Sequence, residues 1–120
     1  MNAALVVAAA LCAGVALAHS LLGERYVLTR LFRRELPKLL GGTEFTKQVL
    51  RFAWHLTSVA WLGFGALLLA LAAGPPNPDT LRAIVAVTFG VHAAITLGSS
   101  RGRHLAWIAF LAIAVLAAIG

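Results

Sequence analysis

The chain has few charged residues and very few acidic ones. Of its 120 residues, 12% are charged and only four are Asp or Glu, whereas 61% are hydrophobic. A soluble domain has about a quarter charged residues. We therefore expect an integral membrane protein with a single domain, residues 1–120, embedded in the lipid bilayer. The ten Lys and Arg residues lie beside apolar segments, which indicates membrane topology and anionic lipid rather than a nucleic-acid partner.

The sequence also lacks the residue sets on which many enzymes depend. Its single cysteine, Cys12, excludes an intrachain disulfide and any redox mechanism that needs two cysteines of one chain. It has no recognisable Ser-His-Asp set, no Walker glycine loop and no paired acidic residues. These absences favour a non-enzymatic role, although the sequence alone leaves enzymatic activity open.

Four apolar segments make up most of the chain, and they cover approximately residues 3–22, 52–73, 83–98 and 105–119. A membrane span needs about 20 residues at a rise of ~1.5 Å per residue, so the fourth segment is short. Thr43 is a suitable N-cap for a helix leading into the second segment, and Asp79-Thr80 for the third. The sequence predicts an all-α fold, an integral membrane four-helix antiparallel bundle.

The basic residues predict how this bundle is oriented. Nine of the ten lie in the first–second and third–fourth connections: Arg25, Arg30, Arg33, Arg34, Lys38, Lys47, Arg51, Arg101 and Arg103. The positive-inside rule places these connections in the cytoplasm. We therefore expect a multi-pass protein of the inner (plasma) membrane with both termini outside, periplasmic in a bacterium. The alternative is a cleaved signal peptide over residues 1–18. It is disfavoured because its start lacks basic residues and because export of the remainder would place seven basic residues outside.

Residues 24–36 have the pattern of a short amphipathic helix lying along the cytoplasmic interface. Its apolar side is formed by Leu28, Leu31 and Phe32. Its basic side is formed by Arg30, Arg33 and Arg34. Pro37 predicts that this helix ends at Leu36. Glu24 falls on the apolar side. It either pairs with a basic group such as Arg25 or Lys38, or turns toward the histidines as a ligand.

The four histidines lie in four different segments and toward one membrane face: His19, His55, His92 and His104. An ionisable side chain within a span is costly, so it usually faces the bundle interior and marks a site. His55 shares a helix face with Arg51 and Ser58, as His92 does with Thr88 and Thr96. We predict that His55 and His92 face the interior within reach of each other, with His19 nearby and His104 peripheral.

This cluster allows a transition-metal or haem b site, because neutral imidazole binds zinc, copper, nickel and iron. The candidate metal ligands are His19, His55, His92 and Glu24. The candidate cofactor pocket is lined by His19, His55, Ser58, His92 and Thr96, with Glu24 and Arg51 at its mouth.

Two other hypotheses need no cofactor. In one, the histidines hydrogen-bond neighbouring helices, and the chain is a non-catalytic accessory protein in a homodimer or a larger membrane complex. A ladder of small residues suits such helix contacts: Ala86, Gly90, Ala94 and Gly98. In the other, the chain is a small proton- or ion-coupled transporter, although no span contains Asp or Glu. We prefer the accessory role because interhelical hydrogen bonds need no special chemistry.

Overall fold

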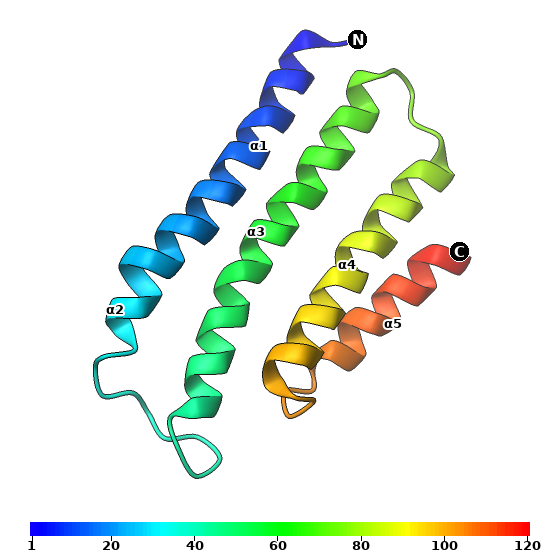
Figure 1. Ribbon diagram of the computed structural model, residues 1–120. Helices are drawn as coiled ribbons and strands as arrows, with labels where there is room; N and C mark the ends of the chain where they lie inside the picture. The colour runs from blue at the N-terminus through cyan, green and yellow to red at the C-terminus, as the bar shows by residue number, and fades with distance from the viewer.

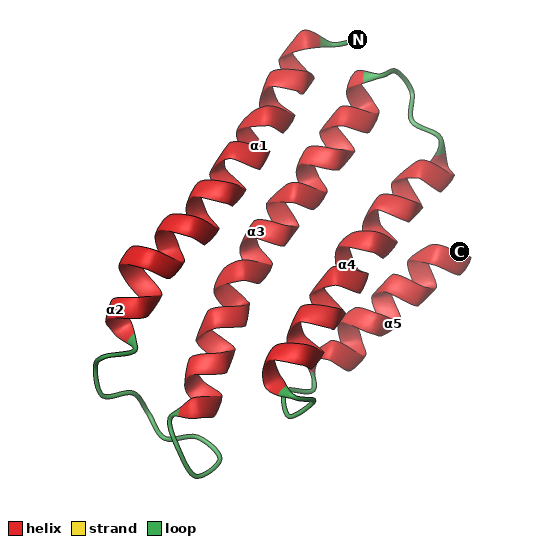
Figure 2. Cartoon of the chain, in the orientation of Figure 1, coloured by secondary structure: helices red, strands yellow, loops and turns green.

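The computed structural model describes residues 1–120 and contains only helices, turns and connecting segments (Figure 2). The predicted all-α class is confirmed. The four main helices are α1 (Ala3–Leu22), α3 (Glu44–Ala72), α4 (Pro78–Ser100) and α5 (Ala106–Ile119). Thr43 precedes the first residue of α3 at the predicted position, but its side chain makes no capping hydrogen bond. The side chain that caps α4 is that of Asn77, two residues before the predicted cap, because Pro78 occupies the first helical position.

α1 does not stop at the end of its apolar segment. A π-helical turn, η1 (Gly23–Leu28), and a last turn, α2 (Thr29–Leu31), extend it to 29 residues in one line (Figure 1). A separate interfacial helix over residues 24–36 is therefore not seen. Gly23 keeps right-handed helical dihedral angles, so nothing breaks the helix there. Leu28 is buried, which fixes the extension to the rest of the protein.

The helices form an open row rather than a closed bundle. α1 packs on α3, α3 on α4, and α4 on α5, while α1 contacts neither α4 nor α5 (Figure 1). The principal-axis extents of the molecule are 51 × 33 × 14 Å, so the arrangement is flat. Between apolar helices in lipid there is no hydrophobic drive toward closure, so neighbouring helices depend on close packing and on interhelical hydrogen bonds.

Three of the helices are long and apolar enough to cross a membrane: Ala3–Leu31, α3 and α4. These candidate spans indicate a multi-pass membrane protein. α5 has 14 residues, or about 21 Å, which is shorter than the ~30 Å hydrocarbon core. The two connections that carry the basic residues lie at the same end of the molecule (Figure 1).

Small residues allow α3 to approach both of its neighbours. A Cβ atom added to Gly65 would lie 3.3 Å from the Cβ of Cys12 on α1. A Cβ atom added to Gly63 would lie 2.7 Å from the side chain of Thr88 on α4. Close backbone approach of this kind replaces the hydrophobic effect as the source of helix packing in lipid.

Candidate functional site

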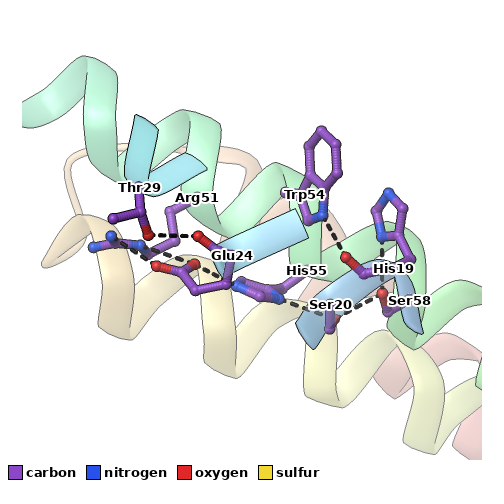
Figure 3. Close-up of polar contacts among 8 residues, drawn as sticks. All are labelled: His19, Ser20, Glu24, Thr29, Arg51, Trp54, His55 and Ser58. Atoms are coloured by element: carbon purple, nitrogen blue, oxygen red, sulfur yellow. Dashed lines mark hydrogen bonds and ion pairs between the residues drawn. The ribbon is translucent and has the colours of Figure 1, made fainter. Parts of the chain in front are cut away.

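The polar side chains of α1 and α3 meet at the end of the molecule that carries the basic residues. α1 and η1 contribute His19, Ser20 and Glu24, whereas α3 contributes Arg51, His55 and Ser58 (Figure 3). Residues 51, 55 and 58 are separated by four and three positions, which places them on one face of α3. The same periodicity places Ser20 and Glu24 on one face of the first helix.

These side chains form one continuous series of hydrogen bonds. The Nδ1 atom of His19 lies 3.1 Å from Ser58 Oγ, and Ser58 Oγ lies 2.8 Å from Ser20 Oγ. Ser20 Oγ is also 2.9 Å from Nδ1 of His55, and His55 Nε2 is 3.1 Å from Glu24 Oε2. Each step joins α1 or η1 to α3 (Figure 3). We call these five side chains the relay.

An ion pair between Glu24 and Arg51 closes the outer end of the relay. Arg51 donates from Nε to Oε2 at 3.2 Å and from Nη2 to Oε1 at 2.9 Å. The two side chains are 36% and 51% exposed, respectively, so this end is open to its surroundings. The main-chain carbonyl of Glu24 accepts from the amide and hydroxyl of Thr29, five residues on, within the π-helical turn. π-Helical turns are rare and often occur at functional sites.

The other end of the relay is enclosed by two tryptophans of α3. The ring of Trp54 stacks on His19 with centroids 4.4 Å apart, and Trp61 meets the same imidazole edge-on at 4.9 Å. Nε1 of Trp54 donates to the carbonyl of His19 at 2.9 Å. Gly23 makes this possible, because any Cβ atom at that position would overlap the indole of Trp54.

A groove of about 420 Å³ lies beside this aromatic end. Its wall includes His19, Tyr26, Trp54 and Trp61, and its remaining lining is aliphatic or glycine. The only hydrogen bond that the His19 ring makes is through Nδ1. Its other nitrogen, Nε2, therefore has no protein partner, and it lies on the side of the ring away from Ser58 (Figure 3).

His92 and Thr96 do not join the relay. Nδ1 of His92 lies 2.7 Å from the carbonyl of Thr88 in its own helix, and its ring packs against Phe110 of α5. Thr96 is fully buried and its hydroxyl has no hydrogen-bond partner. His55 and His92 are not hydrogen-bonded to each other, although the sequence had predicted that they could be. His55 points from α3 toward α1, whereas His92 packs toward α5.

The structure thus separates the candidate residues that come together between α1 and α3 from His92 and Thr96, which lie on α4. His19, His55, Ser58, Glu24 and Arg51 come together, with Glu24 turned toward His55. His104 lies apart, against Phe45 and Phe52. No group of three or more His, Cys, Asp or Glu side chains is arranged to hold a metal ion.

Two further residues of the site were missed in the sequence, Ser20 and Trp54. The signal for Ser20 was its position next to His19 and four residues before Glu24, which puts it on the face of the helix that Glu24 occupies. A tryptophan near the end of an apolar segment is typical of the membrane interface, so the sequence gives no sign that Trp54 packs on His19. The contact of Trp54 with His19 depends on the absence of a side chain at Gly23. Spacing within one helix does not predict such a contact between two helices.

Ser20, His55 and Glu24 form a Ser-His-carboxylate series that the sequence did not suggest. In the serine-protease triad the nucleophile meets Nε2 of the histidine and the carboxylate meets Nδ1, and here the two nitrogens are exchanged. Ser20 also lies inside a continuous helix, where the backbone amides that would form an oxyanion hole are committed to helical bonds. The arrangement can hydrogen-bond and exchange protons, but it lacks the parts for acyl transfer.

Comparison with known proteins finds no matching family model, no similar curated protein and no similar solved structure.

Proposed function

We propose that the protein is a non-catalytic, multi-pass protein of the inner (plasma) membrane that acts as an accessory subunit. The observation that carries this proposal is the relay, in which side chains of the first helix and α3 satisfy one another's hydrogen bonds. Such a network fixes the register of two helices without any chemical step. The basic residues gathered at one end support an orientation with both termini outside.

The energetic requirement for this role is modest. Interhelical hydrogen bonds in membranes average about 0.6 kcal/mol and reach about 1.7 kcal/mol. The relay contains four such contacts, and the Trp54–His19 bond and the Glu24–Arg51 pair add two more. Together they favour one register of the α1–α3 pair over its alternatives, since any shift along the helix axis separates all of them at once.

The open row of helices supports an accessory role in a homodimer or a larger membrane complex. α1 and α5 each have a single neighbour, and both expose apolar side chains along their length. α5 is also too short to cross the hydrocarbon core alone. Helices from a second copy or from another membrane protein would complete such a row.

The alternative functions receive less support from the geometry. Both ring nitrogens of His55 are already hydrogen-bonded, and His92 packs at another interface, so the geometry gives no support to a haem or metal pair of these two residues. Transport needs a polar path along the whole helix. Beyond the relay, Gly65 of α3 meets Ala9 and Cys12 of α1, a close contact of small residues that supplies no series of polar side chains.

Cross-linking in native membranes, combined with mass measurement of the protein in lipid nanodiscs, tests the accessory role. We expect the chain to be recovered with a second copy or with another integral membrane protein. Replacing both His55 and Ser58 with Ala should weaken this assembly, whereas His104→Ala should not. A chain that is monomeric in nanodiscs and forms no cross-link in its own membrane would contradict the proposal.

A further inference from the structure

Two arginines at the end of the first helix have no charged partner within the protein (Figure 1). Arg25 of η1 and Arg30 of α2 are both exposed, and neither forms an ion pair with any of the four acidic residues. Glu24, the carboxylate next to Arg25 in the chain, is bound instead to Arg51 of α3. Arg25 and Arg30 therefore present two positive charges to an anionic ligand.

One aromatic ring holds these two arginines in the same place. The guanidinium carbon of Arg25 lies 5.4 Å from the centroid of the Tyr26 ring, and that of Arg30 lies 5.8 Å from the same centroid. Both distances are within the range of cation–π contacts, about 6 Å. Guanidinium groups bind phosphate oxygens through paired N–H donors. The Tyr26 ring thus gathers two phosphate-binding groups at the basic end of the molecule.

Tyr26 also belongs to the wall of the groove beside Trp54 and Trp61, and the lining of that groove is almost wholly apolar. On the first helix its lining residues extend from Val15 to Val27, which corresponds to about 18 Å at a rise of ~1.5 Å per residue. One leaflet of a membrane contributes about 15 Å, half of the ~30 Å hydrocarbon core. The groove therefore has the length and the lining that suit one acyl chain of a lipid.

The first helix connects the groove to the arginines, because Leu22, Tyr26 and Arg30 recur every four residues and so follow one face. We propose that this surface binds an anionic phospholipid. The phosphate of the headgroup is held by Arg25 and Arg30, and one acyl chain lies in the groove. This binding site goes beyond the accessory role and does not depend on it.

The two parts of the surface together select this ligand class over others. A zwitterionic lipid also carries an ammonium group, and the nearest carboxylate in the chain, Glu24, is already paired with Arg51. The arginines therefore favour a headgroup with a net negative charge. A free phosphate ion or an acidic peptide would satisfy the arginines but would leave the apolar groove unfilled. Only a molecule with an anionic head and an apolar tail matches both the charges and the groove.

Lipids with brominated acyl chains test the proposal, because bromine quenches tryptophan fluorescence on contact. The full chain with Trp107→Phe is placed in phosphatidylcholine nanodiscs, so that fluorescence reports only Trp54 and Trp61. A small fraction of the lipid is then replaced by brominated phosphatidylglycerol or, in a matched sample, by brominated phosphatidylcholine. We expect phosphatidylglycerol to bind about 25-fold more tightly, which corresponds to ~2 kcal/mol for two arginines. Equal quenching by the two lipids would overturn the proposal.

Substitutions distinguish this site from general attraction to the basic end. Arg25→Gln combined with Arg30→Gln should abolish most of the preference for phosphatidylglycerol. The matched control, Lys38→Gln combined with Arg101→Gln, removes the same charge from two other exposed residues and should preserve the preference. Quenching by brominated phosphatidylcholine should be the same in both variants, because the groove lining is unchanged. Equal losses of preference in the two variants would overturn the site.

Two further measurements test the headgroup site. Tyr26→Leu keeps both arginines and an apolar wall but removes the ring that gathers the guanidinium groups, so the preference for phosphatidylglycerol should fall. An undiminished preference would overturn the role of Tyr26. Inorganic phosphate, compared with chloride at equal ionic strength, should leave quenching by brominated phosphatidylglycerol unchanged. Displacement of the lipid by inorganic phosphate would indicate a site for free anions and would overturn the assignment to a lipid.

Discussion

The imidazole of His55 and the carboxylate of Glu24 meet 3.1 Å apart across the α1–α3 contact, although 31 residues separate them in the chain. Glu24 reaches this position because the first helix continues past its apolar segment as a π-helical turn. Had the chain turned along the membrane interface at residue 24, the carboxylate would have left α3. The relay therefore depends on the first helix continuing through residues 23–31. The apolar segment that ends at Leu22 does not by itself predict this continuation.

Removing the carboxylate should destabilise the α1–α3 pair. Glu24→Ala leaves Arg51 and His55 without their shared acceptor, and we expect a loss of about 1 kcal/mol because the pair is partly exposed. Unfolding of the purified protein in mixed micelles measures this change. The matched control is Glu44→Ala, since Glu44 is 75% exposed and pairs only with Lys47. Equal stability of the two variants would show that the ion pair at residue 24 contributes nothing.

The register of α1 against α3 predicts a disulfide. A Cβ atom at residue 65 would lie 3.3 Å from the Cβ of Cys12, close to the separation in disulfides, roughly 3.5–4.5 Å. Gly65→Cys should therefore form an intrachain bond with Cys12 under mild oxidation. Gel mobility with and without reductant detects it. Gly90→Cys is the control, because residue 90 lies on α4, which α1 does not contact. An intrachain bond in that variant would refute the open row.

Gly23 is predicted to be sensitive to substitution by alanine. Any Cβ atom at this position overlaps the indole of Trp54, so Trp54 must leave both its stacking on His19 and its bond to the His19 carbonyl. Overpacking of this kind costs about 1–3 kcal/mol. Gly14→Ala, at an open position of the same helix, should be neutral or slightly stabilising, since alanine favours helix by up to about 1 kcal/mol. Unfolding measurements and tryptophan fluorescence compare the two, and similar effects would contradict the close packing at Gly23.

The sequence predicted the helices better than their contacts. Apolar segment lengths located α1, α3, α4 and α5 to within a few residues at most ends, because each long helix is specified by its own residues. The shared face of Arg51, His55 and Ser58 was also visible, since it follows from spacing within one helix. Which neighbour that face meets is not local information. The sequence predicted His92 as the partner of His55, whereas the structure places Ser20 and Glu24 there, because the row of helices puts α1 and α4 on different sides of α3.

The setting of Ser20 within its helix gives the final prediction. Ser20, His55 and Glu24 resemble a catalytic series in composition, so a reactive serine is the obvious alternative to a structural one. A fluorophosphonate probe distinguishes them, because it modifies a serine only when a base activates the hydroxyl and nearby donors stabilise the oxyanion. Ser20 shares its hydroxyl with Ser58 as well as His55, and its helix leaves no free amide beside it. We therefore expect no covalent labelling of the protein in nanodiscs under conditions that label a serine hydrolase added to the same sample. Labelling that disappears in Ser20→Ala but persists in Ser99→Ala would show that the site is catalytic and would overturn the non-catalytic assignment.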